Sequence, residues 1–121
     1  MTSTDRPLSG DALHFRLGGG PLPDLIDENL VQRAGKSART LVKDGPLRVT
    51  LVALGEGGAL REHSADGPIT VHVISGEIRF TVGAKEWELG PGELLSLGAG
   101  VPHSVDSRGG GIFLLTVATA E

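Results

Sequence analysis

GGALREHSADGPITVHVISG, residues 57–76, and GELLSLGAGVPH, residues 92–103, are the two stretches that decide the fold. Each sets one histidine at a fixed distance from glycines, His63 in the first stretch and His103 in the second. The surrounding sequence is a series of short apolar runs separated by glycine-containing turns, a pattern typical of β structure. We expect the fold to bring these two imidazoles, which are far apart in the sequence, into one site.

The composition bounds the size and the chemistry of the protein. The chain has 121 residues, which predicts a single domain. Hydrophobic residues make up 39% and aromatic residues only 3%, so the core must be built mainly from aliphatic side chains. The 19 glycines are spread along the chain, which indicates many tight turns. Since there is no cysteine, disulfides and thiolate chemistry are excluded.

The charge excludes some classes of partner. The net charge is −4, and the sequence has neither a basic stripe nor the aromatic residues that nucleic-acid binding uses. No apolar run approaches the ~20 residues that span a bilayer. The first residues lack the apolar segment of a signal peptide. We therefore expect a cytoplasmic protein with no nucleic-acid partner and no membrane association.

Strand patterns fill the chain from residue 39 onward. Before them the sequence predicts a short strand over 12–17 and one helix, which is capped by Asp24 and ends near Gly35. Many short strands with one helix indicate an all-β sandwich or barrel. We divide the chain into an N-terminal arm with the helix, residues 1–38, and a β-barrel, residues 39–121. The predicted strands are 40–43, 47–54, 59–63, 69–74, 77–82, 85–89, 93–97, 103–106 and 111–118.

The first stretch resembles the first motif of the cupins, a family of small jelly-roll β-barrels. Gly57, His63 and Gly76 stand in register with that motif. Ala65 occupies the position of the family's second histidine, and Ile69 occupies the position of its glutamate. The glycine skeleton is therefore kept while two of the polar positions are lost.

The second stretch resembles the second cupin motif in the same way. Gly92, Gly100 and His103 stand in register, Gly98 replaces the proline and Ser107 replaces the asparagine. The resemblance covers about residues 40–118. It implies an all-β fold of the cupin type, a double-stranded β-helix or jelly-roll barrel with one short N-terminal helix.

The resemblance also implies a site inside the barrel, because typical cupins hold a divalent metal there with three histidines and one glutamate. Only His63 and His103 keep those positions, since Ala65 and Ile69 have no lone pair to offer. A catalytic site usually has about three protein ligands. The resemblance thus implies at most a weakly held Fe, Mn, Ni or Zn ion. The alternative is a pair of histidines hydrogen-bonded to each other, to water or to backbone.

Strand alternation predicts which other side chains join this site. If strand 59–63 is regular, Arg61 shares the face of His63 and would bind a small carboxylate or phosphate. Its alternative is a solvated position near the strand end. If Ile69 points inward, His72 points outward unless a bulge reverses it. His14 lies in the arm and is expected to be peripheral.

Two classes of function stay open. One is a module that binds a small molecule, in a pocket lined by Arg61, Ala65 and Ile69 beside the two histidines. The other is a metal-dependent small-molecule enzyme of the dioxygenase or isomerase type that uses His63 and His103. Trp87 would cap the core or join a subunit contact. The nearly continuous apolar strand 111–118 predicts cover on both faces, which we assign to the second subunit of a homodimer.

Overall fold

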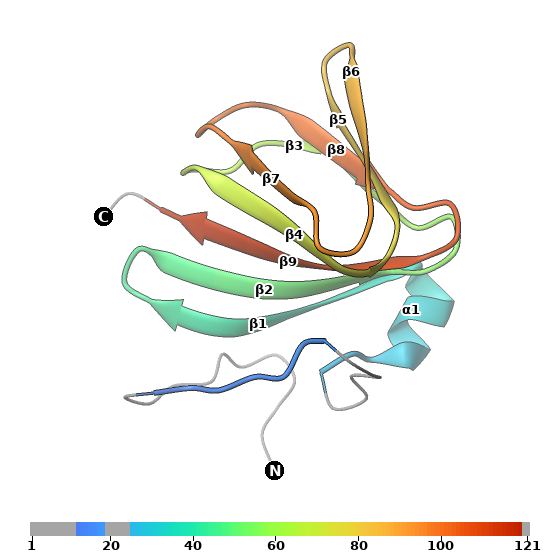
Figure 1. Cartoon of the computed structure of the whole chain (residues 1–121), viewed down its shortest axis with the longest axis horizontal. Coiled ribbons are helices and arrows are strands. Elements are labelled where there is room, and N and C mark those ends of the chain that lie inside the picture. The colour runs from blue at the N-terminus through green and yellow to red at the C-terminus, as the bar shows by residue number, and fades with distance from the viewer. Residues whose placement is uncertain (1–11, 19–24, 120–121) are drawn as a thin grey trace.

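The fold consists of two antiparallel β-sheets packed face to face, with one short helix at the edge of the larger sheet (Figure 1). The computed structural model describes residues 12–18 and 25–119. The larger sheet has the order β1-β2-β9-β4-β7 and the smaller one β3-β8-β5-β6. The elements are α1 (Glu28–Ala34), β1 (Lys36–Asp44), β2 (Leu47–Leu54), β3 (Ala59–His63), β4 (Ile69–Gly76), β5 (Ile78–Val82), β6 (Lys85–Leu89), β7 (Leu94–Leu97), β8 (His103–Asp106) and β9 (Gly111–Ala118). This is the jelly-roll architecture that the sequence predicts.

Five strands, β2, β3, β6, β8 and β9, have the predicted bounds, and β4, β5 and β7 differ by one or two residues. The exception is β1, which begins at Lys36 and is much longer than the predicted strand 40–43. Its register with β2 shifts between Thr40 and Val42. Because a bulge of this kind interrupts the two-residue period, the alternation that marks a strand is hidden there.

The helix begins later than predicted. Asp27 is its N-cap, and the Asp27 side chain accepts a hydrogen bond from the backbone N–H of Leu30 at 3.1 Å. The predicted cap, Asp24, lies outside the described residues. Gly35 ends the helix in the left-handed conformation, with φ +80°. The C-terminal end of the helix is therefore where the sequence places it.

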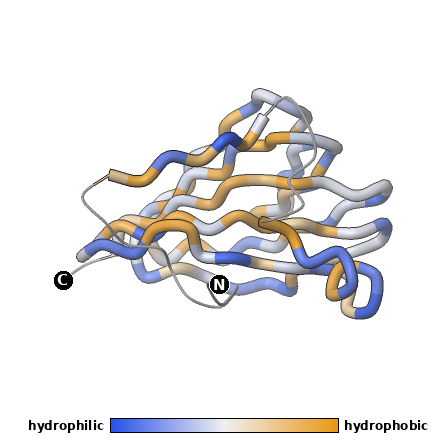
Figure 2. The backbone as a smooth tube through the Cα atoms, turned by 90° about the horizontal axis from the view of Figure 1, so that it is seen from below, coloured by the Kyte–Doolittle hydropathy of each residue, from blue (hydrophilic) through white to orange (hydrophobic). Residues whose placement is uncertain are grey.

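The core lies between the two sheets. In β4, Ile69, Val71 and Val73 point into it, and His72 points to the opposite face, as alternation predicts. Apolar and polar residues alternate along several strands, as the tube in Figure 2 shows. We call the side of each sheet that faces this core the inner face. The buried core residues are Val52, Leu54, Ile69, Val71, Val73, Ile78, Phe80, Leu89, Val105 and Phe113.

The outer face of the larger sheet is covered by the chain's own N-terminal arm. The predicted strand 12–17 is wrong, because these residues form no strand. Instead Phe15 and Leu17 pack against an apolar cluster on this outer face, and Ile112 and Leu114 of β9 belong to the same cluster. The arm thus supplies cover that the sequence analysis assigned to a second subunit. The homodimer itself stays a prediction.

At one glycine, Gly76, the backbones of the paired strands β4 and β9 approach so closely that a side chain does not fit. Gly76 has φ +70° and pairs with Gly111. A Cβ at Gly76 would collide with the carbonyl oxygen of Gly110 and would lie 2.8 Å from the Cα of Gly111. These are backbone atoms, which cannot rotate away.

We predict that Gly76→Ala lowers the free energy of unfolding by about 3 kcal/mol, as the sum of the left-handed backbone penalty and the clash. Gly83→Ala is the matched control, since Gly83 has φ +58° with nothing within 4 Å of its Cβ position. It should cost only about 1 kcal/mol. Urea unfolding of the three proteins measures both values. Equal losses in the two variants would show that the backbone clash is absent.

Candidate functional site

Two histidines lie side by side on the inner face of the smaller sheet. His63 on β3 is the register partner of His103 on β8, and their ring centroids are 4.5 Å apart at an interplanar angle of 58°. The His103 ring also stacks on Phe80, with centroids 5.2 Å apart at 12°. His103 is only 4% exposed and Phe80 is fully buried, whereas His63 is exposed. The pair therefore connects the apolar interior with solvent.

Both imidazoles are held in the same way by backbone carbonyls. His63 Nδ1 donates to the carbonyl of Arg61 at 2.7 Å, and His103 Nδ1 donates to the carbonyl of Val101 at 2.9 Å. Because a carbonyl only accepts, each Nδ1 carries the proton, and the lone pair of a neutral ring lies on Nε2. No described residue forms a hydrogen bond with either Nε2. The rings therefore present two nitrogen lone pairs in the tautomer that accepts a proton donor or a metal ion.

A bulge in β3 determines which of its side chains reach this site. The register shifts between Leu60, opposite Val105, and His63, opposite His103, so that Arg61 and Glu62 together face the single residue Ser104. Leu60 packs against the core, so both Leu60 and His63 lie on the inner face although they are three residues apart. The strand is not regular.

The condition for Arg61 to share the face of His63, a regular strand, is therefore not met, and Arg61 takes the solvated alternative. Its side chain is exposed and does not share the face of His63. The contribution of Arg61 to the site is its backbone carbonyl, which orients the His63 ring. Nothing in the sequence of β3 signals the bulge, because the segment contains neither glycine nor proline.

The two substituted positions of the first motif lie in the apolar interior. Ile69 is 3% exposed and belongs to the core, and Ala65 packs against that core. Within residues 12–18 and 25–119, no three side chains of His, Cys, Asp or Glu are grouped so that they would hold a metal ion. The donor set is therefore two imidazoles, and it does not fit the four-ligand metal site that the cupin resemblance implies.

The other two histidines lie elsewhere. His72 pairs with Leu94 and Leu114, and Leu114 belongs to the cluster on the outer face of the larger sheet. His14 is exposed in the arm. Neither joins the pair on the inner face.

A model of the cupin domain matches residues 48–118, which is more than half of the chain. The chain belongs to the cupin domain family. No curated protein matches it. Among solved structures, it is similar to a conserved protein of unknown function from Streptococcus pyogenes, with 22% identity, a TM-score of 0.71 and coverage of 99% of this chain and 97% of that one.

Two further structures show the same fold. A cupin superfamily protein from Desulfitobacterium hafniense DCB-2 has 18% identity and a TM-score of 0.73, over 89% of this chain and 100% of that one. The polyketide cyclase RemF from Streptomyces resistomycificus has 18% identity and a TM-score of 0.65, over 71% of this chain and 66% of that one.

The described residues of our protein include no helix with the length and apolar character needed to cross a membrane.

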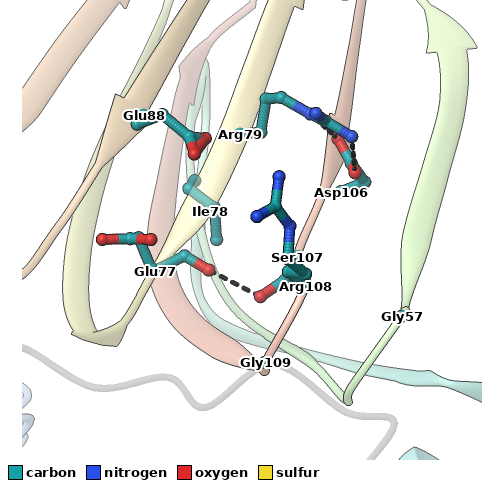
Figure 3. Close-up of a pocket in the computed structure, with 9 residues that line it drawn as sticks. All are labelled: Gly57, Glu77, Ile78, Arg79, Glu88, Asp106, Ser107, Arg108 and Gly109. Atoms are coloured by element: carbon teal, nitrogen blue, oxygen red, sulfur yellow. Dashed lines mark hydrogen bonds and ion pairs between the residues drawn. The ribbon is translucent and has the colours of Figure 1, made fainter.

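The cupin also has a polar cavity of about 220 Å³ at the outer face of the smaller sheet (Figure 3). Arg79 and Asp106 face each other there on β5 and β8, and the guanidinium donates from Nε at 3.0 Å and from a terminal nitrogen at 2.7 Å. These hydrogen bonds lower the pKa of Asp106 from its ordinary value of 3.8, against a smaller opposing effect of desolvation. The lining residues are Gly57, Glu77, Ile78, Arg79, Glu88, Asp106, Ser107, Arg108 and Gly109.

This cavity was missed by sequence reasoning because Arg79 and Asp106 become neighbours only through the register of β5 with β8. Buried Ser107, at the asparagine position of the second motif, donates its hydroxyl to the Glu77 carbonyl at 2.5 Å and ties the loop to β5. The cavity carries carboxylates and guanidinium groups together. It therefore has no clear preference for a ligand of either charge.

We predict that Asp106→Asn destabilises the protein at neutral pH and that the difference disappears in acid. A carboxyl whose pKa is lowered by folding adds stability above its unfolded pKa, and this is lost as the pH falls through the folded value. The difference in urea midpoint between wild type and variant should thus be constant down to about pH 4 and should disappear below it. Urea midpoints across that range measure it, and Asp66→Asn, at an exposed loop position, is the control for removing one charge. A gap that persists in acid would contradict the role of the ionised carboxylate.

Proposed function

We propose that this cupin binds a small molecule on the inner face of the barrel, at the pair His63 and His103. The observation that carries the proposal is the shared tautomer of the two rings, which leaves an Nε2 lone pair on each beside an apolar interior. Such a site accepts a hydrogen bond from a hydroxyl or similar donor while the core side chains contact the rest of the ligand. The bound molecule would thus have an apolar body and one polar group.

The apolar substitutions support binding over metal-dependent catalysis. Ala65 and Ile69 stand at the two positions where the family has ligands, and both pack in the core. A divalent Fe, Mn, Ni or Zn ion on two imidazoles would take the rest of its shell from water, and its affinity would be low. A dioxygenase or isomerase type of reaction would need further ligands that the described chain does not offer. We therefore place small-molecule binding first and the metal-dependent enzyme second.

The proposal predicts that 2-naphthol binds more tightly than 2-methoxynaphthalene, which has the same ring system without the hydroxyl donor. Because one hydrogen bond contributes about 1 kcal/mol, the difference should be about fivefold in Kd. His63→Ala should remove that difference, and His72→Ala, on the opposite face, should leave it intact. Isothermal titration calorimetry measures all six constants. If neither compound binds the wild type, or if the His72 variant behaves like the His63 variant, the site is not at this pair.

A second prediction tests the alignment of the first motif through metal affinity. Ala65→His should raise the affinity for Ni²⁺ by at least about tenfold, because a third imidazole joins the first two. Ile69→Glu in addition should raise it further, but it places a carboxylate at a position that is 3% exposed and will lower the stability of the metal-free protein. Calorimetric titration with Ni²⁺ measures the gain, with His63→Ala in the same background as the control. No gain from the added histidine would mean that Ala65 does not face the pair.

A further inference from the structure

All titratable side chains on the inner faces of the described strands are basic. Alternation along the registered strands places Arg48 in one cross-strand row with Val117 and Ile69, which pack in the core. Lys43 is the direct partner of Arg48 and extends that row to β1. The described strands place no aspartate or glutamate on either inner face. The complete inner set is Lys36, Lys43, Arg48, His63, Lys85 and His103.

Lys43 and Arg48 lie at the end of the larger sheet from which the chain leads to the histidines. A short connection joins His63 at the end of β3 to Ile69 at the start of β4, so the row containing Arg48 includes the residue at which the chain from His63 enters the larger sheet. The β1–β2 turn and the loop between β3 and β4 lie together at the left of Figure 1. On the smaller sheet, Lys85 is the partner of inward-facing Val82, but it lies on the edge strand β6, two strands beyond β8, at the tip of a hairpin that points away from the β1–β2 turn in Figure 1. Lys36, in contrast, lies at the other end of β1.

The described carboxylates near this end form no salt bridge with Lys43 or Arg48. Asp44 pairs with Leu47 and alternates to the outer face, Glu62 lies in the bulge of β3, and Asp66 lies in the following loop. The salt bridge that the described residues form is elsewhere, between Arg79 and Asp106. An inner face whose titratable groups in the described strands are all basic is unexpected in a chain whose net charge is −4. Lys43 directly opposite Arg48 is a like-charge pair, which destabilises a sheet.

We propose that the ligand of this site is an organic anion, with a carboxylate, sulfonate or phosphate group on an apolar body. Arg48 and Lys43 would bind the charged group, and the core side chains and the histidine pair would contact the remainder. A guanidinium binds such oxygens through two parallel hydrogen bonds, and a bound anion relieves the repulsion between Lys43 and Arg48. The same charges repel a divalent cation, so the basic row and the loss of the glutamate at Ile69 act in one direction. This inference rests on the proposed function and names the class of ligand.

The test compares 2-naphthoate with 2-naphthamide, its uncharged counterpart, by isothermal titration calorimetry at low ionic strength. We expect 2-naphthoate to bind several-fold to about tenfold more tightly and to lose that advantage as salt is added. Arg48→Gln should remove most of the advantage of 2-naphthoate over 2-naphthamide, and Lys43 would retain the rest. Lys36→Gln is the matched control, since it removes the same charge from the same inner face at the opposite end of the barrel and should change neither affinity.

The remaining outcomes separate this inference from the proposed function. If both compounds bind equally, or if the Lys36 variant loses as much affinity as the Arg48 variant, the preference for anions is wrong. Selective binding of 2-naphthol would then still support a small-molecule site at the histidines. Lys43→Gln provides a second variant in case Arg48→Gln folds poorly, and it should also weaken 2-naphthoate binding by a few-fold. If no naphthalene compound binds, both the inference and the proposed function are overturned.

Discussion

The bulge in β3 is the constraint on which the inner surface of this barrel depends. By inserting one extra residue opposite Ser104, it allows Leu60 and His63 to face inward from the same short strand. A regular strand would align Arg61 with His63, and Leu60 would then point out of the core. A charged side chain would be directed toward the apolar interior, at a large desolvation cost. The bulge therefore supports the packing of the core and the contact between the two imidazoles at once.

The two histidines keep a local geometry that does not depend on the missing ligands. In each case Nδ1 donates to the carbonyl two residues earlier in the chain, so the orientation of each ring is set by its own backbone segment. Stacking on Phe80 fixes His103 further. This explains how the pair remains ordered beside Ala65 and Ile69, where the family resemblance implies polar ligands. The scaffold of the site is preserved while its donor set is reduced.

The sequence predicts the regular strands well because their two-residue period survives intact. It predicts β1 poorly, since the shift near Thr40 breaks that period, and it leaves the position of Arg61 open for the same reason in β3. Both have one cause: a bulge is a property of the pairing between strands and has no consistent signature in one segment. The salt bridge of Arg79 with Asp106 was out of reach on similar grounds, because it needs the register of β5 with β8.

The apolar cover on β9 shows that a correct burial pattern does not identify the segment that provides the cover. The sequence of residues 111–118 predicts burial on both faces, and the structure does place apolar neighbours on both. The outer neighbours are Phe15, Leu17, Ile26 and others from the chain's own N-terminal part, whose composition alone gives little sign of this role. Burial follows from local hydrophobicity, whereas the identity of the covering segment follows from tertiary structure.

The charge distribution on the inner face follows from the same strand pairing. Each of Lys43, Arg48 and Lys85 reads as an ordinary solvated residue near a strand end, and the overall composition is acidic. Only the register shows that alternation assigns them to the face that carries the histidines, and Asp44 to the other face. All three side chains are exposed, so their charges meet a ligand at the rim of the apolar interior and their attraction for an anion falls as salt is added. A barrel that has exchanged a ligand carboxylate for isoleucine and has basic groups in the same row is suited to receive negative charge.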